Sequence, residues 1–221
     1  MRRSGRLRAV LFDWDGTLVD SAEASFRSYV RLFESYGITF DRPRFAATYS
    51  PDWYRTYEAV GLSRDCWREA DARWVELYCS EKVRLLPGAQ SALARLREAG
   101  LATGLVTSGS RTRIERELAS LDLGASFDRI VCCEDVRARK PDPEPLRLAL
   151  EGLDVASSRA AYVGDSPEDV VMARAAGVFV VGLEGGFPNA DALRASGPDL
   201  MAPTIGEAIA HLLQRAGSVD F

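Results

Sequence analysis

Histidine and cysteine, on which many catalytic and metal sites depend, are scarce in this chain of 221 residues. The one histidine, His211, falls in a helical pattern near the C-terminus. The four cysteines form no Cys-x-x-Cys pair, since they stand at Cys66, Cys79, Cys132 and Cys133. These counts argue against a zinc site and against a nucleophilic triad that depends on histidine. They also predict reduced thiols without disulfides.

Long apolar runs are missing as well. The basic start of the chain, residues 1–8, leads into an apolar run that already ends at Asp13, so a signal peptide is not expected. No segment reaches the ~18 apolar residues that a membrane span needs. The net charge is −4 and both signs are interspersed, which predicts no nucleic-acid partner and no membrane partner. We therefore expect a cytoplasmic protein, either a monomer or a homodimer.

Short apolar runs alternate with helical patterns along most of the chain. Apolar runs typical of buried strands occupy residues 7–12, 101–107, 129–133, 160–164 and 179–182. Apolar residues at helical spacing fill residues 87–100, 110–121, 143–152, 167–177 and 204–216. This alternation predicts an α/β fold, a Rossmann-like parallel sheet flanked by helices. In such a fold, functional groups gather at the carboxyl ends of the strands.

One segment interrupts the alternation. Between the first two predicted strands lies a stretch far longer than a single crossover needs, and it contains helical patterns but no convincing strand. We predict that residues 20–84 form an inserted α-helical cap domain, while residues 1–19 and 85–221 form the Rossmann-like core. Because the insert begins directly after an acidic pair, it is placed to act as a lid.

That acidic pair, Asp13 and Asp15, closes the first apolar run and is followed by Gly16 and Thr17. Side chains alternate along an extended chain, so residues two apart point to the same side. Two crowded carboxylates repel each other unless a cation neutralises them, and oxygen ligands suit Mg²⁺. The pair therefore indicates a possible metal site at the end of the first strand.

The later strands also end in polar residues. The second ends in Val-Thr-Ser-Gly-Ser, which places Thr107 and Ser108 at the start of a helix, where free N–H groups suit an anion. Lys140, one of only two lysines, follows the third strand and precedes a proline. The fourth ends in Gly-Asp-Ser-Pro-Glu-Asp, with Asp165 at the strand end and Asp169 in the first helical turn. Each piece alone is ordinary.

Together these pieces resemble the four motifs of the haloacid dehalogenase-like hydrolase superfamily. The resemblance is strongest to its capped branch, which includes phosphoglycolate phosphatases and β-phosphoglucomutases. Asp13 through Leu18 resemble motif one, Thr107 resembles the key residue of motif two, and Lys140 that of motif three. Gly164 through Ser166, together with Asp169, resemble motif four. The similarity extends from about residue 7 to residue 213.

The resemblance implies a Mg²⁺-dependent phosphatase that transfers the phosphoryl group of a small phosphorylated metabolite through an aspartyl-phosphate. Asp13 would be the nucleophile, and Asp15 the general acid and then the general base. The magnesium ion would be bound by the carboxylates of Asp13 and Asp165 and by the backbone carbonyl of Asp15. Lys140 would neutralise Asp13 and the phosphate, and the Lys140–Pro141 peptide bond is expected to be cis.

The remaining assignments concern the surroundings of the reaction. Thr107, together with the groups around Gly16, Thr17, Ser108 and Gly109, would bind the phosphate oxygens. Asp169 would support the site from behind by a hydrogen bond to Lys140 or to a metal-bound water. Among the many arginines of the insert, Arg55 is our choice for a contact to the substrate.

Other functions stay open. Dehalogenases of the superfamily lack the second acid, so Asp15 argues against them. Phosphonate-cleaving relatives need a lysine in the cap, and the only candidate, Lys82, lies at its linker. Sugar phosphomutases of this branch carry a histidine soon after motif one, which residues 20–25 lack. A non-catalytic phosphoacceptor or partner-binding protein is the alternative outside enzymology.

Overall fold

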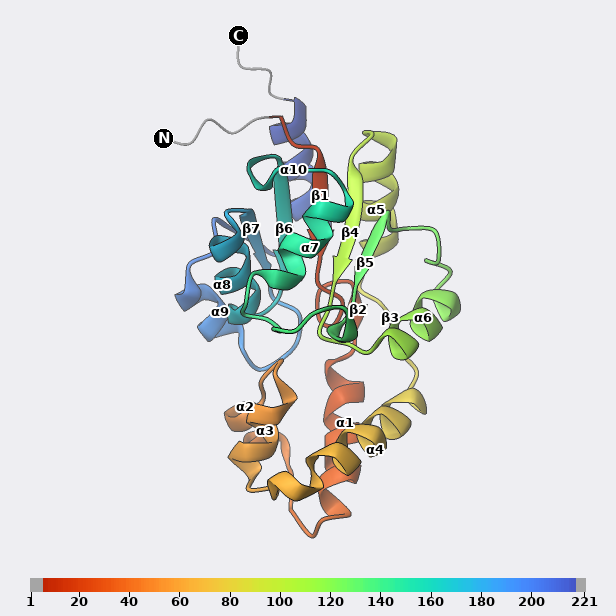
Figure 1. Ribbon diagram of the computed structural model, residues 1–221, viewed down its shortest axis with the longest axis vertical. Coiled ribbons are helices and arrows are strands. Elements are labelled where there is room, and N and C mark those ends of the chain that lie inside the picture. The colour runs from red at the N-terminus through yellow and green to blue at the C-terminus, as the bar shows by residue number, and fades with distance from the viewer. Residues whose placement is uncertain (1–5, 218–221) are drawn as a thin grey trace.

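The computed structural model describes residues 6–217, so the outer ends of the predicted core, residues 1–5 and 218–221, lie outside the described part. Its centre is a parallel sheet of six strands in the order β5–β4–β1–β6–β7–β8 (Figure 1). The strands are β1 (Ala9–Phe12), β4 (Ala102–Val106), β5 (Arg129–Val131), β6 (Ala160–Gly164), β7 (Phe179–Leu183) and β8 (Leu200–Ala202). The α/β, Rossmann-like prediction is confirmed.

Helices cover both faces of this sheet. Val10 and Phe12 pack with α5 (Ala89–Glu98), α6 (Arg111–Ser120) and α10 (Ile205–Gly217). Ala9 and Leu11 point the other way, toward α7 (Glu144–Gly152), α8 (Pro167–Ala176) and α9 (Ala190–Ser196). The strands are continuous apolar runs because both of their faces are buried.

The helices α1 (Ala22–Glu34), α2 (Arg42–Thr48), α3 (Trp53–Val60) and α4 (Trp67–Cys79) gather at one end of the sheet (Figure 1). They have an apolar cluster of their own, which includes Leu32, Phe33 and Tyr57. Phe187, from the loop after β7, joins the same cluster and connects it with the sheet. Three short 3₁₀ turns complete the chain, at η1 (Arg64–Cys66), η2 (Cys133–Asp135) and η3 (Ser157–Arg159).

The two connections between these helices and the sheet run side by side. They form a small antiparallel ribbon of β2 (Val19–Asp20) and β3 (Arg84–Leu85), in which Val19 is opposite Leu85. An ion pair of 3.1 Å between Asp20 and Arg84 crosses the ribbon. The sequence analysis predicts neither of these strands. Strands of two residues are too short to give a periodic pattern.

Two further expectations concerned redox state and membranes. All four cysteines are free, as predicted. Within residues 6–217, every helix is too short or too polar to cross a lipid bilayer.

Candidate active site

Asp13 follows β1 directly, at the carboxyl edge of the sheet. Its N–H donates to the carbonyl of Val163 at 2.9 Å, so pairing with the neighbouring strand β6 continues through Asp13. The Nζ of Lys140 lies 2.6 Å from Oδ1 of Asp13 and 2.8 Å from Oδ1 of Asp169. The peptide bond between Lys140 and Pro141 is cis, as predicted. Lys140 therefore joins two carboxylates that lie far apart in the sequence.

The position of Asp169 is fixed by the start of α8. Its Oδ2 accepts a hydrogen bond from the N–H of Ser166 at 3.1 Å, and its own N–H donates to Oγ of Ser166 at 3.2 Å. This reciprocal pair is a capping box, which satisfies two N–H groups at the helix start. The hydroxyl of Tyr162 donates to the remaining oxygen at 3.0 Å. Asp169 thus accepts a hydrogen bond from Lys140, which is one of the two contacts that the sequence analysis expects of it.

Asp165 differs from its neighbours because one of its carboxylate oxygens has no partner among the residues that the structure describes. It is buried, and its Oδ2 has no hydrogen bond within the described residues. Gly16 makes room for it: the residue has φ +75°, and a Cβ there would lie 2.1 Å from Oδ2 of Asp165. An unpaired buried carboxylate oxygen is costly unless a ligand satisfies it. This oxygen is therefore a ready ligand for a cation.

The donor set around Asp165 fits a divalent metal. Carboxylate oxygens of Asp13, Asp165 and Asp169 lie within 4.8 Å of one another. Burial raises the pKa of Asp13 to about 7, against the opposing charge of Lys140. Burial also raises the pKa of Asp165 well above its ordinary value. When all three carboxylates are ionised, the one ammonium leaves two negative charges uncompensated, which one hard divalent cation would neutralise.

Asp15 is held apart from this group. The guanidinium of Arg113 pairs with both of its oxygens, at 2.5 Å and 3.1 Å, and Tyr78 donates to it at 3.4 Å. Burial acts to raise the pKa of Asp15, but Arg113 outweighs it and holds that pKa below its ordinary value. The two acids of motif one thus have separate basic partners.

The loop after β4 supplies the predicted hydroxyl groups. Thr107 is buried, and its Oγ1 accepts a hydrogen bond from the N–H of Gly109 at 3.0 Å. A Cβ at Gly109 would lie 2.3 Å from Nη2 of Arg113, so glycine is needed there for the guanidinium to reach Asp15. Thr17 is buried beside the acidic pair, and its Oγ1 has no partner within residues 6–217.

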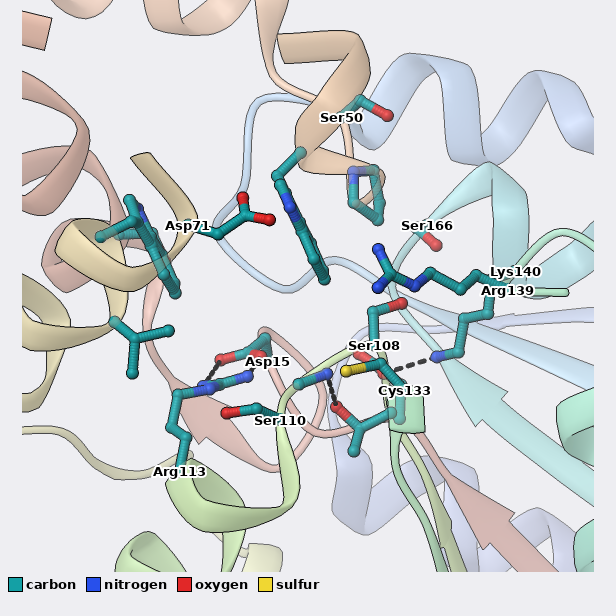
Figure 2. A pocket seen from close by; sticks show the side chains of 18 of the residues that line it. Asp15, Ser50, Asp71, Ser108, Ser110, Arg113, Cys133, Arg139, Lys140 and Ser166 are labelled. Carbon is teal, nitrogen blue, oxygen red and sulfur yellow. Dashed lines mark hydrogen bonds and ion pairs between the residues drawn. The ribbon is translucent and has the colours of Figure 1, made fainter. Parts of the chain in front are cut away.

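A cavity of about 640 Å³ lies between the sheet edge and the helices α1, α3 and α4 (Figure 2). Gly16 and Thr17, which were expected to bind phosphate, are not in its lining. The cavity brings together Asp13, Asp15, Thr107, Ser108, Gly109, Lys140, Asp165 and Asp169. Arg55 is not in its lining; the side chain is exposed and lies 3.6 Å from Asp52. The arginines that line the cavity are Arg113 and Arg139, both from the sheet side.

The family model for haloacid dehalogenase-like hydrolases matches residues 10–183. The chain belongs to this family. The match extends from β1 through β7 and so includes the acidic pair, Lys140 and Asp165. This hydrolase is also similar, over most of its length, to named proteins and to solved structures of other proteins.

A pyrophosphatase named PpaX, from Bacillus velezensis, is 32% identical over 89% of this chain and 92% of its own length. A phosphoglycolate phosphatase from Photorhabdus laumondii is 29% identical over 93% of the chain and 92% of its own length. The crystal structure of CbbY from Rhodobacter sphaeroides with phosphate is 26% identical, with a TM-score of 0.75 over 91% of this chain and 96% of that one. These relatives are named as phosphatases or share the fold.

Arg113 and Tyr162 were missed by the sequence analysis. Tyr162 reads as one more apolar residue of a buried strand, and nothing in the sequence distinguishes it. Arg113 carries a weak signal, because it lies in the first turn of α6, where a positive charge is disfavoured by the helix dipole. An arginine held at such a place needs a partner outside its helix.

Proposed function

We propose that this hydrolase is a Mg²⁺-dependent phosphatase that acts on a small phosphorylated metabolite through an aspartyl-phosphate. The observation that carries the proposal is the buried contact of 2.6 Å between Lys140 and Asp13 at the floor of the cavity. It supplies a carboxylate nucleophile with a fixed positive charge beside it. The names of the relatives support the same class of reaction.

The main physical obstacle is repulsion between a carboxylate and an incoming phosphate. Lys140 offsets part of it, since its ammonium group can face Asp13 and a phosphate oxygen together. A bound Mg²⁺ would neutralise the remaining charge and polarise the phosphoryl oxygens. Asp13 and Asp165 would hold it, with the backbone carbonyl of Asp15.

The bond changes divide between the two acids of motif one. Asp13 forms a bond to phosphorus as the bond to the leaving oxygen breaks, and the leaving group departs with a proton from Asp15. For this step Asp15 must first take up a proton, which the bound phosphate favours because its negative charge opposes the effect of Arg113 on the pKa of Asp15. Water then attacks phosphorus, Asp15 takes up a proton from it, and free Asp13 and inorganic phosphate result. Arg113 orients Asp15 for both steps. Thr107 and the N–H groups around Gly16, Thr17, Ser108 and Gly109 would hold the phosphate oxygens.

We further propose that residues 20–84 act as the cap, on the ribbon formed by β2 and β3, and exclude water during transfer. Phosphoglycolate and pyrophosphate are the substrates that the relatives' names point to. A sugar phosphomutase is disfavoured by the missing histidine at residues 20–25. Arg55 would need to turn inward on closure to meet a substrate. A cytoplasmic location and a monomeric or homodimeric state remain predictions.

The test of this function is hydrolysis of p-nitrophenyl phosphate by the purified protein. Wild-type protein with Mg²⁺ should release phosphate, Asp13→Asn should abolish release, and Asp15→Asn should reduce it by about 10²-fold or more. EDTA should stop the wild-type reaction. Ordinary turnover by Asp13→Asn would contradict the nucleophile assignment.

A further inference from the structure

The half of the cavity that faces the sheet is the proposed phosphate site, but the other half is lined mainly by aromatic side chains. Its wall consists of aromatic side chains from α1, α3, the loop after α2, α4 and the loop after β7. We call this the aromatic chamber, and its rings are Tyr29, Tyr49, Trp53, Tyr57, Trp74 and Phe187. A small polar leaving group such as glycolate could not fill such a chamber or make hydrogen bonds with most of its wall.

Asp71 is the one charged side chain that the helices α1–α4 contribute to the lining. Figure 2 shows its carboxylate directed toward the middle of the pocket, on the far side from Arg139. The hydroxyl of Tyr54 donates to Oδ2 at 2.7 Å, but Oδ1 is buried and has no hydrogen bond of normal geometry. Asp71 takes part in none of the ion pairs formed among residues 6–217. Its charge is therefore not neutralised at contact distance.

The rings beside Asp71 already bind a positive group on one of their faces. The guanidinium carbon of Arg139 lies 4.4 Å from the centroid of Trp53 and 5.6 Å from that of Tyr54. Cations bind aromatic faces through the negative potential of the ring, and the attraction grows when water is excluded. The wall of the chamber can therefore hold a second cation on the rings that Arg139 leaves free.

From this juxtaposition, and resting on the proposed phosphatase function, we propose that the aromatic chamber and Asp71 bind an organic cation. The substrate is then a phosphate monoester whose leaving group ends in a quaternary or protonated amine. A neutral group would leave the half-buried Asp71 carboxylate without a counter-charge at contact distance, and an anionic group would be repelled by it. Both halves belong to one cavity, so a single molecule can place its phosphate at Asp13 and its cation at Asp71.

The experiment compares matched substrates that differ only in charge. Trimethylammonioalkyl phosphates of increasing chain length are each paired with the isosteric tert-butylalkyl phosphate, whose terminal carbon replaces nitrogen. At the chain length that spans the cavity, wild-type kcat/KM for the cation should exceed that for its neutral partner by about tenfold or more. Asp71→Asn should lower this ratio several-fold, to the part that the aromatic rings supply alone. Glu76→Gln, which removes the same charge from an exposed position on α4, should leave it unchanged.

Equal hydrolysis of both members at every chain length would overturn the proposal, as would a ratio that Asp71→Asn does not change. Turnover of phosphoglycolate or pyrophosphate far above that of every cationic ester would also overturn it. The ratio is insensitive to a general loss of activity, and circular dichroism shows whether Asp71→Asn is folded. If the wild-type protein fails on p-nitrophenyl phosphate as well, the phosphatase function itself is wrong.

Discussion

Single residues decide how the two acids of motif one differ. Asp13 faces Lys140, whereas Asp15 is bound by both guanidinium nitrogens of Arg113. Arg113 also lies 3.3 Å from Glu117, one turn along α6. The side chains of Arg113 and Glu117 are both buried. A buried network of charges is stable only while each member keeps its partners. Arg113 is therefore a positioning residue for Asp15 and a structural residue for α6.

Replacing Arg113 with Ala should lower the free energy of unfolding by about 3 kcal/mol, because Glu117 and Asp15 lose their counter-charge. Arg113→Lys should restore part of that stability, but a lysine cannot form the bidentate contact with both oxygens of Asp15. We therefore expect kcat to stay reduced while KM changes little. The measurements are urea unfolding and steady-state kinetics. Arg116→Ala, on the exposed side of α6, is the control and should change stability by less than about 0.5 kcal/mol. Wild-type kinetics in Arg113→Lys would refute the positioning role.

Most motif residues could be predicted because Asp13, Thr107 and Asp165 directly follow strands, while Lys140 precedes a proline in the loop after β5. The pairing of Arg113 with Asp15 could not be predicted, because it joins positions 98 residues apart through the packing of α6. Likewise, Arg55 was chosen for its place near aromatic residues, but α3 turns it toward solvent. Side-chain direction on a cap helix depends on tertiary packing that the local sequence does not encode.

At the scale of elements, the helices α1–α4 and the loops between them contact the sheet side through aromatic side chains. Tyr49, after α2, stacks on Phe187, after β7, with ring centroids 4.6 Å apart and planes at 14°. Arg113 lies 5.0 Å from the ring centroid of Tyr78 on α4. Short apolar runs predicted the strands of the sheet, and apolar residues at helical spacing predicted most helices. The short elements α2, α9, β2 and β3 were missed, because few residues and little buried surface leave little pattern to detect.

The stack between Tyr49 and Phe187 should couple the cap to the core. In a double-mutant cycle of Tyr49→Ala and Phe187→Ala, we expect a coupling energy of about 0.5–1.5 kcal/mol. Tryptophan fluorescence during urea unfolding is a suitable probe, since Trp53, Trp67 and Trp74 lie in the helices α3 and α4, whereas Trp14 packs in the apolar cluster beside the sheet. A coupling energy of zero would mean that the two rings do not hold the cap against the sheet.

At the scale of the whole molecule, the sheet edge and the helices α1, α3 and α4 enclose one cavity with an excess of negative charge on its floor. Its carboxylates Asp13, Asp165 and Asp169 face a single ammonium group. Folding alone brings these like charges together, and ligand binding can recover the stability that this repulsion costs. The metal site should therefore be visible in stability as well as in activity.

Millimolar Mg²⁺ should raise the melting temperature of the wild-type protein, because a ligand that binds only the folded state stabilises it. Asp165→Asn should lose most of this shift, since its buried unpartnered oxygen is the proposed ligand. The same variant without metal should melt no lower than the wild type, because a buried charge has been removed. Differential scanning calorimetry with and without Mg²⁺ measures both effects. An undiminished Mg²⁺ shift in Asp165→Asn would remove this residue from the metal site.

The most direct test is to locate the phosphoryl group on the protein. Asp15→Asn lacks the base for hydrolysis but can still react with acetyl phosphate, whose leaving group needs no proton. Acid quenching followed by peptide mass spectrometry should then find the phosphoryl group on Asp13. Phosphate found on another residue, or none found while the substrate is consumed, would contradict the account.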